Sequence, residues 1–344
     1  MTATHELTVV EVITETRDAV SLVLAAAHDA REHFAYQAGQ FLTLRIPASD
    51  GAVSRCYSLS SSPTTDEHLK VTVKRTSGGL ASNWLCDHAT AGMTLESLTP
   101  AGAFTVRPAE TELIFVAAGS GITPVISMIR AVLLQSARRA TLVYANRDRD
   151  SVIFDAELSE LIAAHADRLT IAHWLESESG LPTEAGLRAL LPETPGAGTA
   201  AYLCGPAAFM DVAAAALHHA GVAREHVHRE VFVSLTTDAF ANPERSPSSA
   251  AAESATATVE IDGETHEITW PKTEVLLDTL LARGIDAPYA CREGNCGACA
   301  YTVREGEVSM RINDTLDDYE LGIGVRLACQ SIPESDYLSA IFDR

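Results

Sequence analysis

Four cysteines near the C-terminal end constrain this chain of 344 residues more than any other feature. Three of them, Cys291, Cys296 and Cys299, follow the spacing C-x4-C-x2-C, and the fourth, Cys329, stands further along the chain. This spacing is typical of a plant-type [2Fe–2S] cluster, in which one loop supplies three thiolates and the fourth comes from elsewhere in the fold. The alternatives are a structural zinc ion, which usually takes two short C-x2-C pairs, and disulfide bonds, which suit small secreted domains.

Two glycines lie between these cysteines, Gly294 and Gly297. Glycine readily adopts positive φ angles, and a loop that turns its backbone N–H groups toward sulfur needs such angles. The glycines therefore fit a cluster loop, and the specific cysteine spacing favours the cluster over the two alternatives. An iron–sulfur centre carries one electron at a time and must receive it from elsewhere. We therefore expect the rest of the chain to show where the electrons come from.

The chain is strongly acidic, with a formal net charge of −21. A nucleic-acid-binding surface needs clustered Lys and Arg side chains, so this charge argues against nucleic acid as a partner. The segment 256–344 alone carries 17 acidic and 7 basic side chains. Two interpretations of that excess stay open: a solvated surface that keeps the protein soluble, or a docking face that steers a basic partner.

Three further cysteines, Cys56, Cys86 and Cys204, are scattered through the chain, which suits a reducing cytoplasm better than a disulfide framework. The first residues lack a basic region followed by an apolar run, so we expect no signal peptide. No apolar run approaches the roughly 18 residues that a membrane span requires. These features predict a soluble cytoplasmic protein without a membrane partner.

Residues 1–106 contain short segments in which apolar and polar side chains alternate, bounded by Gly, Pro, Asp or Ser. The segments are 7–13, 20–24, 41–46 and 69–74. This pattern predicts the antiparallel strands of a small barrel. Between the last two segments, Arg55 and Tyr57 fall on the same face of an extended stretch, so the guanidinium and the phenol ring could bind the same ligand.

A second polar cluster follows the strand expected at 69–74. Gly78 and Gly79 lead through Ser82 into a helix that we expect to begin at Asn83. A glycine pair and a serine before a helix can present backbone N–H groups to a pyrophosphate. Each polar cluster is a weak signal by itself, because an Arg-x-Tyr-Ser stretch is more often an ordinary strand end.

Residues 107–233 change to a strand–loop–helix pattern. The apolar run 112–118 fits a central parallel strand that is buried on both faces. It leads into Gly119 and Gly121, which let the backbone approach a phosphate at the positive end of the next helix. Pro124 fits an early helical position, although it stands where the third glycine of a G-x-G-x-x-G pattern would be.

The same pattern continues with strands expected at 140–145, 169–174 and 200–204, and a helix through Met210 to Ala220. Arg147 follows the first of these strands. The carboxyl edge of that strand is where an open α/β sheet usually holds the adenosine ribose.

Residues 234–254 have the composition of a linker, and about twenty flexible residues would span on the order of 25 Å. The remaining segment, 255–344, opens on two alternating runs joined by Asp262-Gly263, which is a strong hairpin signal. A helix is expected at 274–282, before the cluster loop. The chain is therefore predicted to contain a barrel, an α/β domain, a linker and a cluster domain.

In this combination and order, the motifs resemble the ferredoxin–NAD(P) reductase superfamily, in the arrangement flavin domain, nicotinamide domain, C-terminal ferredoxin. The resemblance covers the whole chain. It implies an antiparallel β-barrel that binds FAD, a Rossmann-like α/β domain that binds NADH, and an α+β β-grasp ferredoxin domain that binds the cluster. FAD is favoured over FMN by segment 74–82, and NADH over NADPH because Asp148 beside Arg147 would repel a 2′-phosphate.

The resemblance also implies roles for individual residues. Tyr57 would pack on the isoalloxazine, Arg55 would meet the pyrophosphate, and Cys204 would stand beside the nicotinamide. The expected cofactor-binding residues are Arg55, Tyr57, Ser58, Lys74, Gly79, Ala81, Ser82, Gly119, Gly121, Thr123, Pro124, Arg147, Gly205, Pro206, Glu230 and Phe232. The expected catalytic residues are Ser58, Thr123 and Cys204, with Cys204 positioning a ring because no base stands beside it in its motif. The expected cluster ligands are Cys291, Cys296, Cys299 and Cys329.

Segments 77–88, 144–148, 291–299, 308–314 and 328–331 are similar to the reductase components of bacterial 3-ketosteroid 9α-hydroxylases, which serve Rieske-type oxygenases in steroid degradation. This resemblance implies an NADH-dependent oxidoreductase that passes electrons from NADH through FAD and the cluster to a terminal oxygenase. One alternative is the reductase of another oxygenase, such as phenylacetyl-CoA epoxidase or an aromatic-ring dioxygenase. Another is an electron carrier whose flavin and nucleotide sites are degenerate.

Overall fold

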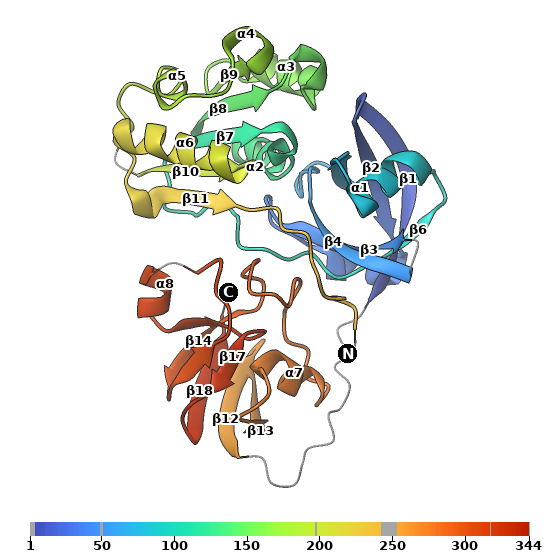
Figure 1. Cartoon of the computed structure of the whole chain (residues 1–344), viewed down its shortest axis with the longest axis vertical. Helices are drawn as coiled ribbons and strands as arrows, with labels where there is room; N and C mark the ends of the chain where they lie inside the picture. The colour runs from blue at the N-terminus through green and yellow to red at the C-terminus, as the bar shows by residue number, and fades with distance from the viewer. Residues whose placement is uncertain (1–3, 49–50, 197, 242–252, 317, 344) are drawn as a thin grey trace. The chain divides into compact units, whose positions relative to one another are not determined.

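The computed structural model describes residues 4–48, 51–196, 198–241, 253–316 and 318–343 (Figure 1). The chain forms two compact units. The larger unit holds Glu6–Pro100 and Phe104–Phe232, and the smaller one is built chiefly from Val233 onward. Among the described residues, no helix is both long and apolar enough to cross a membrane.

The first half of the larger unit is a six-stranded antiparallel barrel. Its strands are β1 His5–Thr16, β2 Ala19–Ala26, β3 Phe41–Ala48, β4 Gly51–Ser58, β5 Leu69–Lys74 and β6 Thr94–Ser97, with the 3-10 helix η1 His28–Phe34 after β2. They follow the order β4-β3-β6-β1-β2-β5, and a bridge between Leu59 and Val71 joins the end of β4 to β5. Alternating apolar side chains of the strands meet Leu85 of helix α1 (Leu80–His88) in one core.

The second half of the larger unit is a parallel sheet with helices on both faces (Figure 1). Its strands are β7 Glu112–Ala118, β8 Arg139–Asn146, β9 Leu169–Leu175, β10 Thr199–Cys204 and β11 Val227–Glu230, in the order β11-β10-β7-β8-β9. Helices α2 Ile122–Gln135 and α3 Asp155–Ala164 pack on one face, and α5 Glu184–Arg188 and α6 Ala207–His219 on the other. The connections contain α4 Glu176–Ser179, η2 Gly119–Gly121, η3 Arg149–Ser151 and η4 Arg224–His226. Strands β7 and β10 are apolar because both of their faces are covered.

The parallel topology gathers three predicted segments at one edge of this sheet. Gly119 follows β7, Arg147 follows β8 and Gly205 follows β10. Parallel strands all end at the same edge, so these residues come together although they are far apart in the sequence.

The barrel and the α/β half pack closely within the larger unit. Arg130 of α2 donates to Asp66 at 2.7 Å, after the barrel strand β4, and also pairs with Glu157 of α3 at 3.3 Å. Ser127 donates from its hydroxyl to the carbonyl of Ser61 at 2.6 Å. These partly buried polar contacts hold the two halves in one arrangement.

The smaller unit contains a mixed five-stranded sheet in the order β13-β12-β18-β14-β16. Its strands are β12 Ser254–Ile261, β13 Glu264–Pro271, β14 Ala300–Glu305, β16 Val325–Leu327 and β18 Tyr337–Phe342. Strands β15 Val308–Met310 and β17 Ser331–Pro333 form a second, two-stranded sheet. The unit also contains the helices α7 Leu276–Leu281 and α8 Asp318–Gly322. Strands β12 and β13 form the predicted hairpin, in which Asp262 and Gly263 have φ angles of 51° and 79°. Two positive φ angles in succession are what a tight hairpin turn requires.

The predicted elements are present, with two differences that concern the barrel. Strand β6 was not expected, because four residues are too few for alternation to be seen. Helix α1 begins at Leu80 and not at Asn83, since Gly79 is its N-terminal cap. As a result Ala81 and Ser82 lie in the first helical turn instead of before it.

Candidate active site and cluster site

The loop after β7 packs directly against the turn after β10. Gly119 has a φ of 54°, a left-handed conformation that favours glycine. A Cβ atom on Gly121 would lie 2.0 Å from the carbonyl oxygen of Cys204 and 2.9 Å from the nitrogen of Gly205. A Cβ atom on Gly205 would come within 3.0 Å of the Cβ of Ala118. The backbones approach this closely because glycine stands on both sides, so the two segments predicted to bind nicotinamide lie directly against each other.

Two hydroxyl groups support this loop. The Thr123 hydroxyl donates to the carbonyl of Ser120 at 3.0 Å, and the Tyr144 hydroxyl donates to the carbonyl of Gly119 at 3.0 Å. Thr123 and Pro124 are buried in the first turn of α2. The Thr123 proton is therefore engaged inside the loop, and the oxygen keeps lone pairs for a ligand.

Cys204 is the last residue of β10 and is fully buried. It lies beside Ala117 of β7 and Glu230 of β11, while Pro206 caps α6. Burial, and to a lesser degree the nearby Glu230 carboxyl, raises the pKa of the Cys204 thiol well above its usual range. Burial also raises the pKa of Glu230 to about 8. Near pH 7 both groups are neutral, so the thiol is suited to positioning a ring and not to nucleophilic attack.

The segment that closes the α/β half stands at the edge of its sheet. Beyond Glu230, the side chains of Val231 and Phe232 are 51% and 49% exposed. An aromatic ring in this position has an open face on which a cofactor could pack. The expected contact of Phe232 with the flavin stays a prediction.

Strand β4 carries the residues of the predicted flavin motif. Arg55 and Tyr57 are half-buried and lie opposite Leu44 and Leu42 of β3. Burial raises the pKa of Tyr57, so its phenol stays protonated, and its ring packs against the barrel core. Ser58 is buried, and within the described part of the chain its hydroxyl makes no hydrogen bond, which leaves it for a ligand.

The second predicted flavin segment forms the turn that leads into α1. Gly78 has a φ of 71°, and Gly79 is the N-terminal cap. A Cβ atom on Gly79 would lie 2.3 Å from the Thr76 hydroxyl and 2.4 Å from the Ser82 hydroxyl, and those two hydroxyls are hydrogen-bonded at 2.7 Å. No side chain among the described residues caps α1, so first-turn N–H groups such as that of Ala81 can face an anion. The turn therefore fits a pyrophosphate.

Charged side chains of the barrel and the α/β half meet near the loop 119–124, the predicted nicotinamide loop. Arg147 donates to Asp18 of the barrel at 2.6 Å, and Arg17 pairs with Asp148 at 3.6 Å. Lys74 is half-buried close to both pairs, and burial lowers the pKa of its amine. Arg147 is paired with Asp18, a partner that no local pattern could reveal, and its expected contact with a nucleotide stays a prediction.

The four predicted cluster ligands lie together in the smaller unit. The Cys291 sulfur is within hydrogen-bond reach of Cys296 and Cys329, and Cys329 is also within reach of Cys299. Cys296 is partly exposed and the other three are buried. Contact with neighbouring thiols lowers the pKa of Cys291 and raises those of Cys296 and Cys329. A set of mutually accessible sulfurs with one easily formed thiolate fits an iron–sulfur cluster.

The loop between the first three cysteines has the expected backbone. Gly294 and Gly297 have φ angles of 82° and 70°, and Arg292 also has a positive φ, 59°. These left-handed residues turn the chain sharply between one cysteine and the next. The loop can therefore bring three thiolates to one side, as the predicted cluster requires.

Hydrogen-bond donors face the sulfurs. The N–H of Glu293 donates to Cys291 at 3.4 Å, and the N–H of Cys329 donates to Cys299 at 3.5 Å. The side-chain amide of Gln330 donates to the sulfur of Cys329 at 3.5 Å. Donors of this kind stabilise thiolate ligands and tune the reduction potential of a cluster.

A contact that was not predicted joins the cluster loop, 291–299, to the segment assigned to a linker. Glu293 accepts hydrogen bonds from Thr236 and Thr237, and Arg292 donates to the carbonyl of Ala241. The composition of the segment does not predict this contact, because threonine and glutamate side chains are common on any protein surface. The rest of the predicted linker, 242–252, lies outside the described residues.

Comparison with known proteins identifies the chain. The FAD-binding and NAD-binding domains of oxidoreductases match residues 6–106 and 115–215, and the 2Fe-2S iron-sulfur cluster binding domain matches 259–334. The ferredoxin reductase component of 3-ketosteroid-9-alpha-monooxygenase from Mycolicibacterium smegmatis is 50% identical, over 98% of this chain and 97% of that protein. The chain belongs to this family of ferredoxin reductase components. It is an oxidoreductase that binds FAD, NADH and a [2Fe–2S] cluster and works with an oxygenase component.

Two further similarities place the reductase in a wider group. A component of the 1,2-phenylacetyl-CoA epoxidase of Escherichia coli is 34% identical, over 100% of this chain and 99% of that protein. The structure of phthalate dioxygenase reductase matches with a TM-score of 0.60 and 25% identity, over 99% of this chain and 98% of that one. The predicted family, fold class and cofactors are confirmed by these matches.

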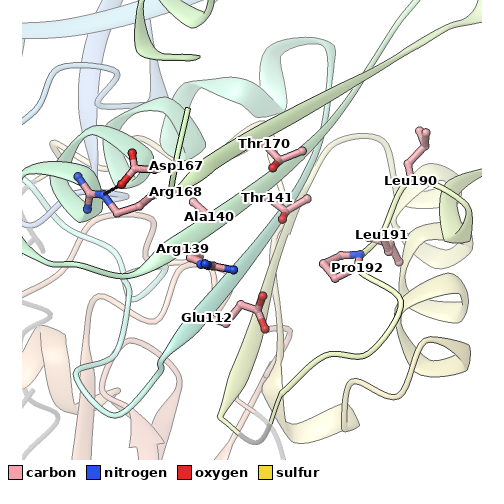
Figure 2. Close-up of a pocket in the computed structure, with 10 residues that line it drawn as sticks. All are labelled: Glu112, Arg139, Ala140, Thr141, Asp167, Arg168, Thr170, Leu190, Leu191 and Pro192. Carbon is pink, nitrogen blue, oxygen red and sulfur yellow. Dashed lines mark ion pairs between the residues drawn. The ribbon is translucent and has the colours of Figure 1, made fainter. Parts of the chain in front are cut away.

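The reductase also has a cavity of about 330 Å³ on its parallel sheet, shown in Figure 2. It lies where β7, β8 and β9 begin, at Glu112, Arg139 and Thr170, beside the turn that contains Pro192. Because parallel strands begin at one edge and end at the other, this cavity is on the opposite edge from the nicotinamide loop. It is not part of the site described above.

Proposed function

We propose that this reductase accepts a hydride from NADH and delivers the two electrons singly to a Rieske-type oxygenase that hydroxylates 3-ketosteroids during steroid degradation. The observation that carries the proposal is that one chain holds both a close-packed glycine loop after β7 and four cysteines whose sulfurs lie within reach of one another. In an electron carrier with degenerate flavin and nucleotide sites, the close packing of Gly121 on the Cys204 carbonyl would serve no purpose. The 50% identity with the 3-ketosteroid component supports the choice of oxygenase.

The barrel residues would bind and orient the flavin. When bound, FAD supplies hydride acceptance and one-electron release, and the cluster supplies one-electron transfer. Tyr57 would lay its ring on the isoalloxazine, since its phenol is protonated and its body packs on the core. Arg55 and the first turn of α1 would hold the pyrophosphate by charge and by backbone N–H groups.

The sheet residues would orient the nicotinamide. Gly119 and Gly121 let the ring approach the backbone, and the neutral thiol of Cys204 would pack against it without forming a bond. The Ser58 hydroxyl would donate a hydrogen bond at flavin N5. Thr123 would offer its oxygen as an acceptor, because its proton is bound to Ser120.

The partner and location follow from charge and redox chemistry. Segment 256–344 carries 17 acidic and 7 basic side chains, which suits a basic docking face on the oxygenase. Cys56, Cys86 and Cys204 form no disulfide among the described residues, which suits a reducing compartment, so we propose a cytoplasmic location, where NADH is supplied.

The first test is an anaerobic titration of the purified reductase with NADH, followed by visible absorbance and low-temperature EPR. We expect flavin bleaching together with a rhombic [2Fe–2S] signal. Bleaching without that signal would reject the internal relay and leave a simple flavin reductase. A parallel experiment adds a purified 3-ketosteroid oxygenase and its steroid: product formation supports the proposed partner, and product only with a phenylacetyl-CoA epoxidase or a ring dioxygenase would replace it.

A further inference from the structure

Arg130 of α2 joins the α/β half of the larger unit to the barrel through a bidentate contact. Its two terminal nitrogens donate to the two carboxylate oxygens of Asp66, at 2.7 and 2.5 Å. One of them also donates to the Thr65 hydroxyl at 3.1 Å. The Arg130 side chain is only 17% exposed. A bidentate pair of this kind fixes both the distance and the angle between the groups that it joins.

Asp66 is itself held firmly within the barrel half. Its carboxylate accepts the backbone N–H of Ser62 at 3.0 Å, and its own N–H donates to the Ser62 carbonyl at 3.1 Å. Burial acts to raise the pKa of Asp66, but hydrogen bonds from Arg130 and Ser62 outweigh it and lower this pKa. Asp66 is therefore a carboxylate at neutral pH, and the bond to Arg130 is charge-assisted.

Glu157 of α3 makes a second link between the same two halves. One of its carboxylate oxygens pairs with Lys70 of β5 at 3.4 Å, and the other pairs with Arg130 at 3.3 Å. The two links are thus coupled through one carboxylate. Close by, the Ser127 hydroxyl of α2 donates to the Ser61 carbonyl of the barrel half at 2.6 Å. Together these contacts fasten α2 and α3 to the barrel.

The fastened elements lead to the residues that are expected at the two reacting rings. Helix α2 begins inside the predicted nicotinamide loop. Strand β5 ends at Lys74, whose amine is 3.6 Å from the place that a Cβ atom on Gly119 would take. Ser58, the expected contact of flavin N5, ends β4 and precedes the segment that Arg130 binds. Arg130 therefore connects the strand of the flavin motif to the helix of the nicotinamide loop.

We propose that Arg130 is a positioning residue for hydride transfer, because it sets the separation between the nicotinamide loop and the flavin strand. This inference rests on the proposed transfer of hydride from NADH to FAD, which requires the reacting atoms to lie about 3–3.5 Å apart. The start of α2 lies about 12 Å along the helix from Arg130, so a rotation of about 5° at this contact moves the loop by about 1 Å. A misplacement of that size slows a reaction by roughly 100-fold.

An apolar contact at this place would hold the two halves together without fixing their angle. Burial of apolar surface is non-directional, whereas a bidentate ion pair allows one orientation. Buried ion pairs also contribute little net stability compared with apolar groups of similar size. The residues expected to bind NADH belong to the α/β half, so the affinity for NADH should not depend on Arg130. Its effect should appear in the rate of hydride transfer.

The test compares the holoenzyme with Arg130→Met and with the matched control Arg168→Met. Arg168 is 21% exposed and binds the other end of α2, where it donates to the carbonyls of Leu133 and Ser136 at 2.9 and 2.6 Å. These contacts lie inside the α/β half. The control therefore removes a comparable guanidinium from the same helix without touching the link to the barrel.

Anaerobic stopped-flow mixing with NADH at a series of concentrations separates the limiting rate of flavin bleaching from the dissociation constant of NADH. For Arg130→Met we expect a limiting rate lower by roughly 10- to 100-fold and a dissociation constant within about twofold of the wild type. The charge-transfer absorbance between flavin and nicotinamide should weaken. Arg130→Lys keeps the charge but not the bidentate geometry, so its rate should fall between the two.

The control Arg168→Met should bleach at the wild-type rate, even if its urea midpoint is lower. A second readout needs no cofactor: deuterium exchange of the flavin-free protein at the Ser62 and Asp66 amides. This exchange should be faster in Arg130→Met and unchanged in Arg168→Met, because only Arg130 holds that segment against α2.

A wild-type limiting rate in Arg130→Met, or an equal loss of rate in Arg168→Met, would overturn the proposal, since the contact would then serve stability alone. If Arg130→Met does not fold, Arg130→Lys decides in its place. Slower bleaching with unchanged NADH affinity in that variant supports the proposal, and wild-type bleaching rejects it. Absence of flavin bleaching in the wild type would reject the proposed hydride transfer itself, and this inference with it.

Discussion

The nicotinamide loop, 119–124, and the cluster loop, 291–299, both depend on glycine, but for different physical reasons. In the first, Gly121 has an ordinary φ and is required because the carbonyl of Cys204 occupies the space of a side chain. In the second, Gly294 and Gly297 are required chiefly for their positive φ angles. Both loops contain a left-handed glycine, Gly119 in the first, but a backbone approach as close as the 2.0 Å at Gly121 occurs only in the first.

This difference predicts different behaviour without ligands. The nicotinamide loop is held by its neighbours in the same sheet, so it should keep its shape in the apoprotein. The cluster loop brings three sulfurs close to a fourth, that of Cys329, and the natural partner of such a set is iron, whose bonds to its ligands contribute folding energy directly. Removal of the cluster should therefore loosen the smaller unit, while removal of flavin should leave the parallel sheet intact.

The largest effect is expected for Cys296→Ser, which removes one ligand from the cluster loop. Hydride transfer from NADH to flavin should persist, and one-electron reduction of a protein acceptor should fall to background, because no cluster is left to carry it. Stopped-flow flavin bleaching and reduction of cytochrome c measure the two activities.

Cys86→Ser is the matched control, since Cys86 is a half-buried thiol on α1, outside the cluster. It should leave both activities intact. Normal turnover of the protein acceptor by Cys296→Ser would show that the cluster is dispensable.

Gly121→Ala tests the close packing of the nicotinamide loop. The new Cβ would need the space of the Cys204 carbonyl, so the loop must shift. Overpacking of this kind costs about 1–3 kcal/mol, and a displacement near 1 Å slows hydride transfer roughly 100-fold. Urea unfolding and NADH-dependent flavin bleaching measure these effects.

Gly196→Ala in the same half of the larger unit is the control, because its Cβ would meet nothing closer than 3.8 Å. It should change neither stability nor flavin reduction. Equal behaviour of Gly121→Ala and Gly196→Ala would refute the view that backbone packing shapes this loop.

Gly294→Ala tests the positive φ of the cluster loop. An L-residue in the left-handed region costs about 1–2 kcal/mol, and here the Cβ would also lie 3.0 Å from the carbonyl of Ile312. We expect faster loss of the visible cluster absorbance on warming, with unchanged flavin reduction. Gly322→Ala, in α8 with nothing within 4 Å, should retain the cluster like the wild type. Identical cluster loss in both variants would mean that φ is not the constraint.

Local patterns predicted most of this molecule correctly. The C-x4-C-x2-C spacing, the Gly119–Gly121 turn and the Asp262-Gly263 hairpin are short-range signals, and each lies in the element that was predicted for it. Parallel strands such as β7 are buried on both faces, so their sequences are continuous apolar runs, and such runs can be recognised without the structure. The limits of α1 were missed because a glycine cap leaves little trace in composition.

The contacts that sequence analysis missed join distant parts of the chain. Arg147 and Asp18 are 129 positions apart, and Glu293 and Thr236 are 57 apart. Neither pair has a periodicity or a motif, so only the fold brings the partners together. The same limit explains why segment 234–254 was assigned to a linker by composition, although its described part binds the cluster loop.

The smallest effect is expected for Glu230→Gln, next to Cys204 in the nicotinamide site. The pKa of Glu230 is raised by burial from 4.5 to about 8. Between these values the folded protein holds a proton that the unfolded chain releases, so the free energy of unfolding decreases as pH rises from 4.5 to 8. Glutamine cannot ionise, and Glu230 is only half-buried, so the variant should gain roughly 1 kcal/mol relative to the wild type across this range.

Urea midpoints of both proteins at pH 5, 6, 7 and 8, followed by tryptophan fluorescence, measure this gain. The variant's advantage should grow with pH, while the EPR signal of the cluster stays the same in both proteins at every pH. Parallel curves would show that the carboxyl is solvated and ionised at neutral pH. In that case Cys204 would lie beside a negative charge. The neutral surroundings of Cys204 would then no longer distinguish the nicotinamide loop from the cluster loop, and only the backbone packing at Gly121 would.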